Sequence, residues 1–97
     1  MTDIVWLPEA QDDTKRLFKF LEDKNPAAVA RAAQALIKGA DFLTDYPQAG
    51  RPMNDGTGRR ELLIPFGPGA YVLRYIFDQD TVLIIRAWHS RENREQP

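Results

Sequence analysis

The stretch that decides the fold runs from Tyr71 to His89 and reads YVLRYIFDQDTVLIIRAWH. Both halves are rich in β-branched and aromatic residues, which favour strands, and a polar Asp-Gln-Asp between them is typical of a tight turn. The sequence therefore predicts a β-hairpin with strands over residues 71–77 and 81–89.

Alternation along these strands predicts which face is buried, because successive side chains point to opposite faces. The residues expected to face the core are Tyr71, Leu73, Tyr75, Phe77, Leu83, Ile85 and Ala87. The opposite face of the last strand would then carry Val82, Ile84, Arg86 and Trp88. Arg74 and Arg86 are therefore expected to lie together on one exposed face of the sheet.

Upstream of the hairpin, residues 60–66 predict a further strand, and Gly67-Pro68-Gly69 is expected to form the turn that follows it. Residues 46–58 concentrate proline and glycine without apolar periodicity, which indicates a connecting loop. Loops of this length are often functional.

The N-terminal half predicts one strand, Asp3 to Leu7, and two helices. Pro8 suits the first position of a helix over residues 8–23, and Asn25-Pro26 repeats this signal as the N-cap and first residue of a second helix that Pro47 ends. The apolar face expected for the second helix consists of Val29, Ala33, Leu36, Ile37, Ala40 and Leu43. The order β-α-α-β-β-β predicts an α+β fold, with a mainly antiparallel sheet and a helical hairpin packed on one face, in a single domain over residues 1–97.

Composition limits the chemistry that this chain can perform. Its 97 residues contain no cysteine and one histidine, so thiolate catalysis and Cys- or His-rich metal sites are excluded, and we expect neither a metal nor a cofactor. It has no phosphate-binding loop motif and no nucleophile-elbow motif. Because it also has no apolar run of about 20 residues and no signal-peptide pattern, we expect a cytoplasmic protein without a membrane partner.

Charge is unevenly distributed along the chain. The net charge is −1, which does not favour general attraction to nucleic acid. Residues 51–97 nevertheless hold seven cations, all of them arginine. Arginine suits carboxylate and phosphate recognition, so these residues predict either a recognition surface or an ordinary solvated face.

His89 and Trp88 each allow two interpretations. His89 is either a hydrogen-bonded residue at the end of a strand or a general acid or base flanked by arginines. Trp88 is either a packing residue at the margin of the sheet or an anchor for a partner.

Six short motifs occur in a characteristic order over nearly the whole chain. They are Trp6-Leu7-Pro8-Glu9-Ala10, Asn25-Pro26-Ala27-Ala28, Leu43-x-x-x-Pro47-x-x-Gly50-Arg51, Gly58-Arg59-Arg60-Glu61-Leu62, Tyr71-Val72-Leu73-Arg74-Tyr75 and Ile85-Arg86-Ala87-Trp88-His89-Ser90-Arg91. With this arrangement the chain resembles the RelE/ParE superfamily of toxins from type II toxin–antitoxin, or plasmid stabilisation, modules. The resemblance implies the fold predicted above and a cognate antitoxin as partner, with DNA contacted only through the antitoxin complex.

The superfamily contains two branches with different targets. ParE-like members inhibit DNA gyrase, whereas RelE-like members cleave mRNA in the ribosome with a basic cluster and usually a late tyrosine or histidine. This chain is mildly acidic, has no lysine after Lys38 and lacks the late tyrosine, which favours a ParE-like gyrase inhibitor without catalytic residues. The alternatives are a ribosome-dependent endoribonuclease using His89, Arg60, Arg74 and Arg91, and a non-toxic domain that only binds an antitoxin. In each case the surface expected to meet the target or the antitoxin comprises Arg60, Arg74, Arg86, Trp88, His89 and Arg91.

Overall fold

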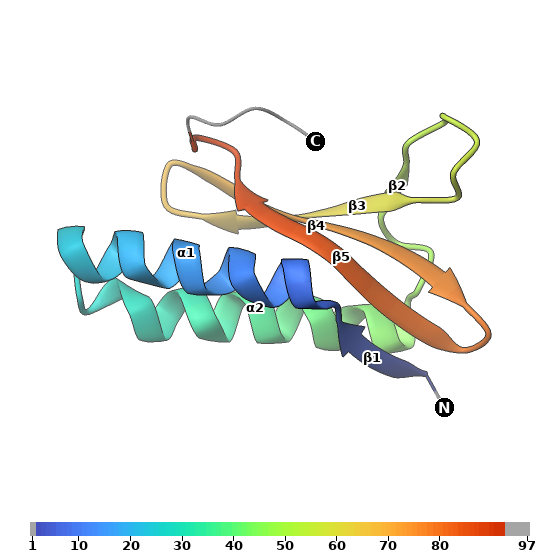
Figure 1. Ribbon diagram of the computed structural model, residues 1–97, viewed down its shortest axis with the longest axis horizontal. Coiled ribbons are helices and arrows are strands. Elements are labelled where there is room, and N and C mark those ends of the chain that lie inside the picture. Colours follow the sequence, from blue (N-terminus) through green and yellow to red (C-terminus); the bar gives the residue numbers. More distant parts are fainter. Residues whose placement is uncertain (1, 93–97) are drawn as a thin grey trace.

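Two helices cover one face of a five-stranded sheet in the computed structural model, which describes residues 2–92 (Figure 1). The elements are, in order, β1 (Asp3–Trp6), α1 (Pro8–Lys24), α2 (Ala28–Asp45), β2 (Arg51–Pro52), β3 (Arg60–Phe66), β4 (Gly69–Asp78) and β5 (Thr81–His89). The strand order is β1-β5-β4-β3-β2, with β1 parallel to β5 and the other neighbours antiparallel. The predicted α+β class is confirmed. The short strand β2 is an addition, because it lies within the segment predicted as loop.

The helical hairpin differs from prediction at the start of α2. Asn25 is not the N-cap of α2; it is the C-cap of α1, where its N–H donates to the carbonyl of Leu21 at 2.6 Å. The N–H of Ala28 then donates to the carbonyl of Asn25, which closes a turn, and α2 begins after Ala27. Asn25-Pro26 therefore forms the link between the helices instead of the first turn of α2.

The buried face of α2 is also rotated from the predicted one. Ile37 was expected in the core but is 57% exposed. The residues of α2 that are buried are Ala28, Ala32, Leu36, Gly39, Ala40 and Leu43. Glycine at position 39 suits this packing, because an added Cβ would meet the side chain of Ile64 on β3, which would then have to move.

A β-bulge changes the predicted pattern of burial in β5. Arg74 pairs with Arg86, whereas the next residue, Tyr75, pairs with Ile84, so Ile85 is an extra residue opposite this step. The extra residue reverses the alternation, and Val82 and Ile84 lie in the core instead of Leu83 and Ile85. The predicted core residues Tyr71, Leu73, Tyr75 and Ala87 are confirmed, and Phe77 packs partly buried against them. Within residues 2–92, no helix is long and apolar enough to cross a membrane.

Candidate functional site

A buried carboxylate organises the contact between α1 and β5. Asp13 is 2% exposed, and its oxygens accept hydrogen bonds from Arg86 Nε at 2.8 Å and from the N–H of Ala87 at 2.9 Å. Arg16 donates to Asp13 as well, and also to Glu92 at 2.7 Å. We call Asp13, Arg16, Arg86 and Glu92 the junction cluster. It binds the last turn of the described chain to α1.

Hydrogen bonding keeps the junction cluster ionised. Burial by itself would raise the pKa of Asp13, but the hydrogen bonds from Arg86, Ala87 and Arg16 outweigh it, and the pKa lies below its ordinary value of 3.8. The hydrogen bond to Asp13 raises the pKa of Arg86. The charges of this cluster therefore neutralise one another at neutral pH.

Arg74 is built into the sheet and is not on an exposed face. It is 5% exposed, and Glu61 on β3 accepts hydrogen bonds from its Nε at 3.0 Å and its Nη2 at 2.8 Å. Its guanidinium also lies 4.9 Å from the ring centroid of Trp88, which is itself buried. The expectation that Arg74 and Arg86 share an exposed face is therefore wrong: the bulge lies beside them, Arg86 reaches α1, and Arg74 is covered.

Arg60 and Tyr75 together hold the segment that follows α2. Arg60 Nη1 donates to the carbonyls of Gln48 at 3.1 Å and Gly50 at 2.8 Å. The buried Tyr75 hydroxyl donates to the carbonyl of Pro47 at 2.8 Å and accepts from the N–H of Gly50 at 2.9 Å. Residues 47–50 are thus fixed to the sheet by two side chains.

Both ring nitrogens of His89 are occupied by the backbone. Nδ1 accepts a hydrogen bond from the N–H of Arg91 at 3.2 Å, so Nε2 carries the proton and donates to the carbonyl of Phe66 at 2.9 Å. The ring also packs edge-on against Tyr71, with 5.1 Å between centroids. This arrangement matches the interpretation of His89 as a hydrogen-bonded residue at the end of a strand.

The structure does not bring the predicted surface residues to one point. Arg60 pairs with Tyr75 and His89 with Tyr71, so the two lie four residues apart along β4, or about 14 Å at about 3.4 Å per residue. Arg91 has an exposed side chain, and the other five residues of the predicted set are at least partly buried in contacts of the fold. Among residues 2–92, no group of three His, Asp or Glu side chains could hold a metal ion.

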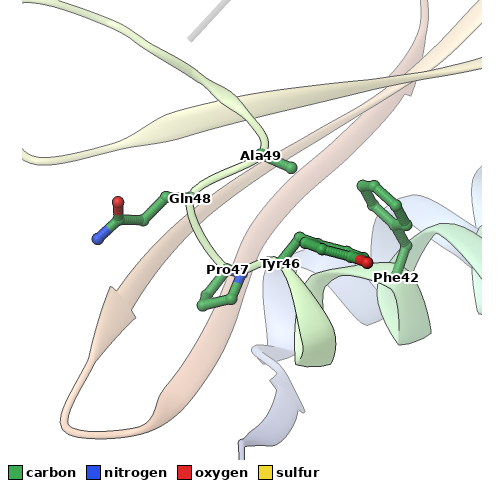
Figure 2. Close-up of a pocket in the computed structure, with 5 residues that line it drawn as sticks. All are labelled: Phe42, Tyr46, Pro47, Gln48 and Ala49. Carbon is green, nitrogen blue, oxygen red and sulfur yellow. The ribbon is translucent and has the colours of Figure 1, made fainter.

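An apolar hollow lies at the C-terminal end of α2 (Figure 2). We call it the aromatic hollow. Its volume is about 350 Å³, and it is lined by Phe42, Tyr46, Pro47, Gln48 and Ala49. The rings of Phe42 and Tyr46 lie 4.9 Å apart at the helix end, and Gln48 is directed away from them (Figure 2). Both aromatic side chains are about half exposed, at 46% and 59%. Exposed aromatic residues next to a hollow are typical of a protein-binding surface.

The outer edge of β3 is also open beside α2. The two residues of β2 pair only with Glu61 and Arg60. Within residues 2–92 no strand pairs with the outer edge of residues 62–66, and Leu63 is 51% exposed. An unpaired edge with an exposed apolar side chain can accept a strand from another protein.

Sequence reasoning missed Asp13 and the aromatic hollow, although each left a signal. Asp13 lies between Ala10 and Leu17 at helical spacing, so an acidic side chain on the apolar face of α1 was readable from the sequence. Phe42 and Tyr46 are separated by four residues, which places both on one side of a helix. Arg16, three residues after Asp13 on α1, is a local partner, whereas Arg86 comes from β5 and could not be predicted from spacing within the helix.

The chain matches a known family over most of its length. Residues 4–94 match the family model described as the ParE toxin of the type II toxin–antitoxin system, parDE. Two similar proteins come from Caulobacter vibrioides. Toxin RelE1 is 40% identical over 85 residues, which cover 88% of this chain and 89% of the relative. Toxin RelE3 is 34% identical over 87 residues, which cover 90% and 92%.

Two solved structures have the same fold. One, of the chromosomal ParDE toxin–antitoxin system from P. aeruginosa, matches with a TM-score of 0.76 and 16% identity, covering 92% of this chain and 96% of that one. The other, of the toxin–antitoxin complex RelBE2 from Mycobacterium tuberculosis, matches with a TM-score of 0.64 and 24% identity, covering 91% and 96%. The names of the similar proteins include both ParE and RelE, so they do not distinguish between the two targets.

Proposed function

Because the chain belongs to the ParE toxin family of type II toxin–antitoxin systems, we propose that it acts as a ParE-like toxin that inhibits DNA gyrase by binding it. One observation carries this choice: the residues that an endoribonuclease would use are engaged by the fold itself. Cleavage of a phosphodiester needs groups that hold the phosphate and move protons on both sides of it. A gyrase inhibitor needs only a complementary surface.

Three of the candidate catalytic residues support this argument. His89 has both ring nitrogens bonded to the backbone, Arg74 is paired with Glu61, and Arg60 is bonded to carbonyls of residues 48 and 50. His89 and Arg60 are also too far apart, at about 14 Å along β4, to act on one phosphate. The geometry therefore favours a toxin that acts by binding.

A ribosome-dependent endoribonuclease is the second candidate, because a relative that is 40% identical is named Toxin RelE1. Its catalytic set would be His89 with Arg60, Arg74 and Arg91. Rearrangement on the ribosome would be needed to release His89 from Phe66 and Arg91.

The experiment compares two assays on the purified chain and on His89→Gln. Glutamine can still bond the carbonyl of Phe66 but cannot act as a base near neutral pH, so it separates packing from catalysis. We expect inhibition of gyrase supercoiling by both proteins and intact mRNA in ribosome primer-extension assays. Cleavage at the ribosomal A site by the parent, lost in a folded His89→Gln, would establish the endoribonuclease instead. Growth unaffected by induced expression would leave only a non-toxic antitoxin-binding domain.

We further propose that a cognate antitoxin covers the aromatic hollow and the outer edge of β3. The hollow offers half-exposed rings on segment 42–49, and its floor is held in place by Tyr75 and Arg60. A rigid apolar hollow binds a partner side chain with little loss of conformational entropy. The neighbouring edge of β3 supplies unpaired backbone groups for an extended segment.

This surface is tested with Phe42→Ser and the protein encoded by the neighbouring gene. We expect the affinity for that antitoxin to fall by about tenfold or more, because a central aromatic contact is lost. Phe20→Ser is the matched control, since Phe20 is 61% exposed on α1, away from the hollow. Equal affinities of the two variants would place the antitoxin elsewhere.

A further inference from the structure

The loop between β2 and β3, residues 53–59, stands out from the sheet at the end where residues 47–50 are fixed (Figure 1). Three of its residues have left-handed backbone conformations: Asn54 with φ 58°, Gly56 with φ 81° and Gly58 with φ 78°. They alternate with residues of negative φ. Turns that alternate right- and left-handed residues present backbone N–H groups that bind anions, and we call residues 53–59 the nest.

Some backbone N–H groups of the nest have no hydrogen-bond partner in the loop itself. Within the described residues, the N–H groups of Asn54, Gly56 and Gly58 make no hydrogen bond. The loop keeps its shape by other contacts, because Asp55 Oδ1 accepts from the N–H of Thr57 at 3.1 Å and also from its hydroxyl. The one carboxylate of the loop is thus already bonded to the loop's own donors.

A small hollow and a local positive charge accompany the nest. The hollow has a volume of about 200 Å³ and is lined by Pro52, Asn54, Gly56, Gly58, Arg59 and Arg60. Residues 51–60 contain three arginines and one aspartate, a local charge of +2 in a chain whose net charge is −1. Glycine at two lining positions leaves the backbone accessible to a bound group.

We propose that the β2–β3 loop is a phosphate-binding site, with Arg59 as its main charged contact. A phosphate offers oxygens in several directions, which suits several unbonded N–H groups of one loop together with a guanidinium. The site binds without cleaving, since His89 lies about 14 Å along β4 from the Arg60 end. This inference goes beyond the gyrase and antitoxin proposals and does not depend on either.

The test uses amide NMR shifts of the full chain, titrated separately with inorganic phosphate and with a short single-stranded oligodeoxythymidylate. We expect saturable shifts at the N–H groups of Asn54, Gly56 and Gly58. Tighter binding of the oligonucleotide would identify a nucleic-acid backbone as the source of the phosphate, and equal or tighter binding of inorganic phosphate would identify a free phosphate. Absence of loop shifts with both probes would overturn the proposal, as would equal shifts with polyglutamate.

Two pairs of variants separate the site from general effects. Arg59→Ala should weaken binding of the better probe by about tenfold, whereas Arg31→Ala, which removes the same charge from the exposed surface of α2, should leave it nearly unchanged. Gly56→Ala should also weaken binding, whereas Gly67→Ala should not. Both glycines have positive φ and open space around an added Cβ, so the backbone strain is matched. Equal effects within either pair would overturn the assignment.

Discussion

Arginine has different surroundings at the junction cluster and at the β2–β3 loop. Arg16 and Arg86 each form an ion pair with Asp13, and Arg16 bonds Glu92 as well. Arg51 and Arg59 flank the loop and form no ion pair within residues 2–92. The first pair of arginines joins α1 to β5, whereas Arg51 and Arg59 make no such bond within the described residues. Hydrogen bonds from Thr57 and, to a smaller extent, the charge of Arg59 lower the pKa of Asp55 in the loop.

This difference shows that residue type alone does not identify a binding surface. The sequence presents seven arginines after residue 50, and any of them could have been a recognition residue. The bonding partner of an arginine determines its role. A guanidinium bonded to a buried carboxylate is part of the scaffold, and removal of the arginine leaves the buried carboxylate with an uncompensated charge. A guanidinium beside unpaired N–H groups is a candidate for binding.

The largest effect is expected at the junction cluster. Asp13→Ala should lower the free energy of unfolding by about 3 kcal/mol, because it removes the acceptor of Arg86 and of the Ala87 N–H in a buried site. Chemical denaturation followed by circular dichroism measures this change. Asp12→Ala, at the exposed neighbouring position, should change stability by less than about 0.5 kcal/mol. Similar losses in both variants would show that the junction cluster is not a scaffold.

The next effect tests whether the segment under the aromatic hollow is as firmly held as the junction. Tyr75→Phe should cost about 2 kcal/mol, because the buried Pro47 carbonyl and Gly50 N–H lose their shared partner. Hydrogen exchange at the Gly50 N–H should become faster in this variant. Tyr46→Phe serves as the control, since the Tyr46 side chain is 59% exposed. Unchanged exchange at Gly50 would mean that Arg60 alone holds this segment.

A smaller effect on stability is expected to distinguish Arg74 from Arg91, two arginines for which the sequence predicts the same surface role. Arg74→Ala should lower the free energy of unfolding by about 1.5 kcal/mol, through loss of the bonds to Glu61 and the contact with Trp88. Arg91→Ala should change stability by less than about 0.5 kcal/mol because its side chain is exposed. A loss of toxicity in Arg91→Ala would therefore report on contact with the target, because the stability of the protein is nearly unchanged. A loss of toxicity in Arg74→Ala must be read against thermal unfolding of the same variant.

The fold was largely predictable because its signals are local. Pro8 at a helix start, the hairpin of residues 71–89 and the break at residues 67–69 depend on neighbours in the chain. The errors arose where a distant contact decided the outcome. No local pattern predicts the bulge at Ile85, which depends on the register between β4 and β5. The same shift invalidated the predicted face for Arg86.

The candidate site was less predictable, for the same reason. The sequence correctly suggested that His89 ends a strand, but its bond to Phe66 joins residues 23 positions apart. The partner of Arg74, Glu61 on β3, is 13 positions away in the sequence, and that of Arg86, Asp13 on α1, is 73 positions away. The roles of these chemically identical arginines are therefore set by long-range contacts within the sheet and between the sheet and the helices.

The smallest expected effect is the change in the free energy of unfolding at low pH. The pKa of Asp13 is lower in the folded protein than its ordinary value, because the bonds from Arg86, Ala87 and Arg16 outweigh burial, which acts in the opposite direction. A lowered folded pKa means that the ionised carboxylate stabilises the fold fully above the unfolded pKa, and that this contribution is lost as the pH falls through the folded value. The difference in unfolding free energy between the parent and Asp13→Asn should therefore be constant from about pH 7 to about pH 5 and shrink below about pH 4. Urea denaturation at a series of pH values measures it. A difference that persists undiminished to about pH 2 would contradict an ionised Asp13 as the centre of the junction cluster.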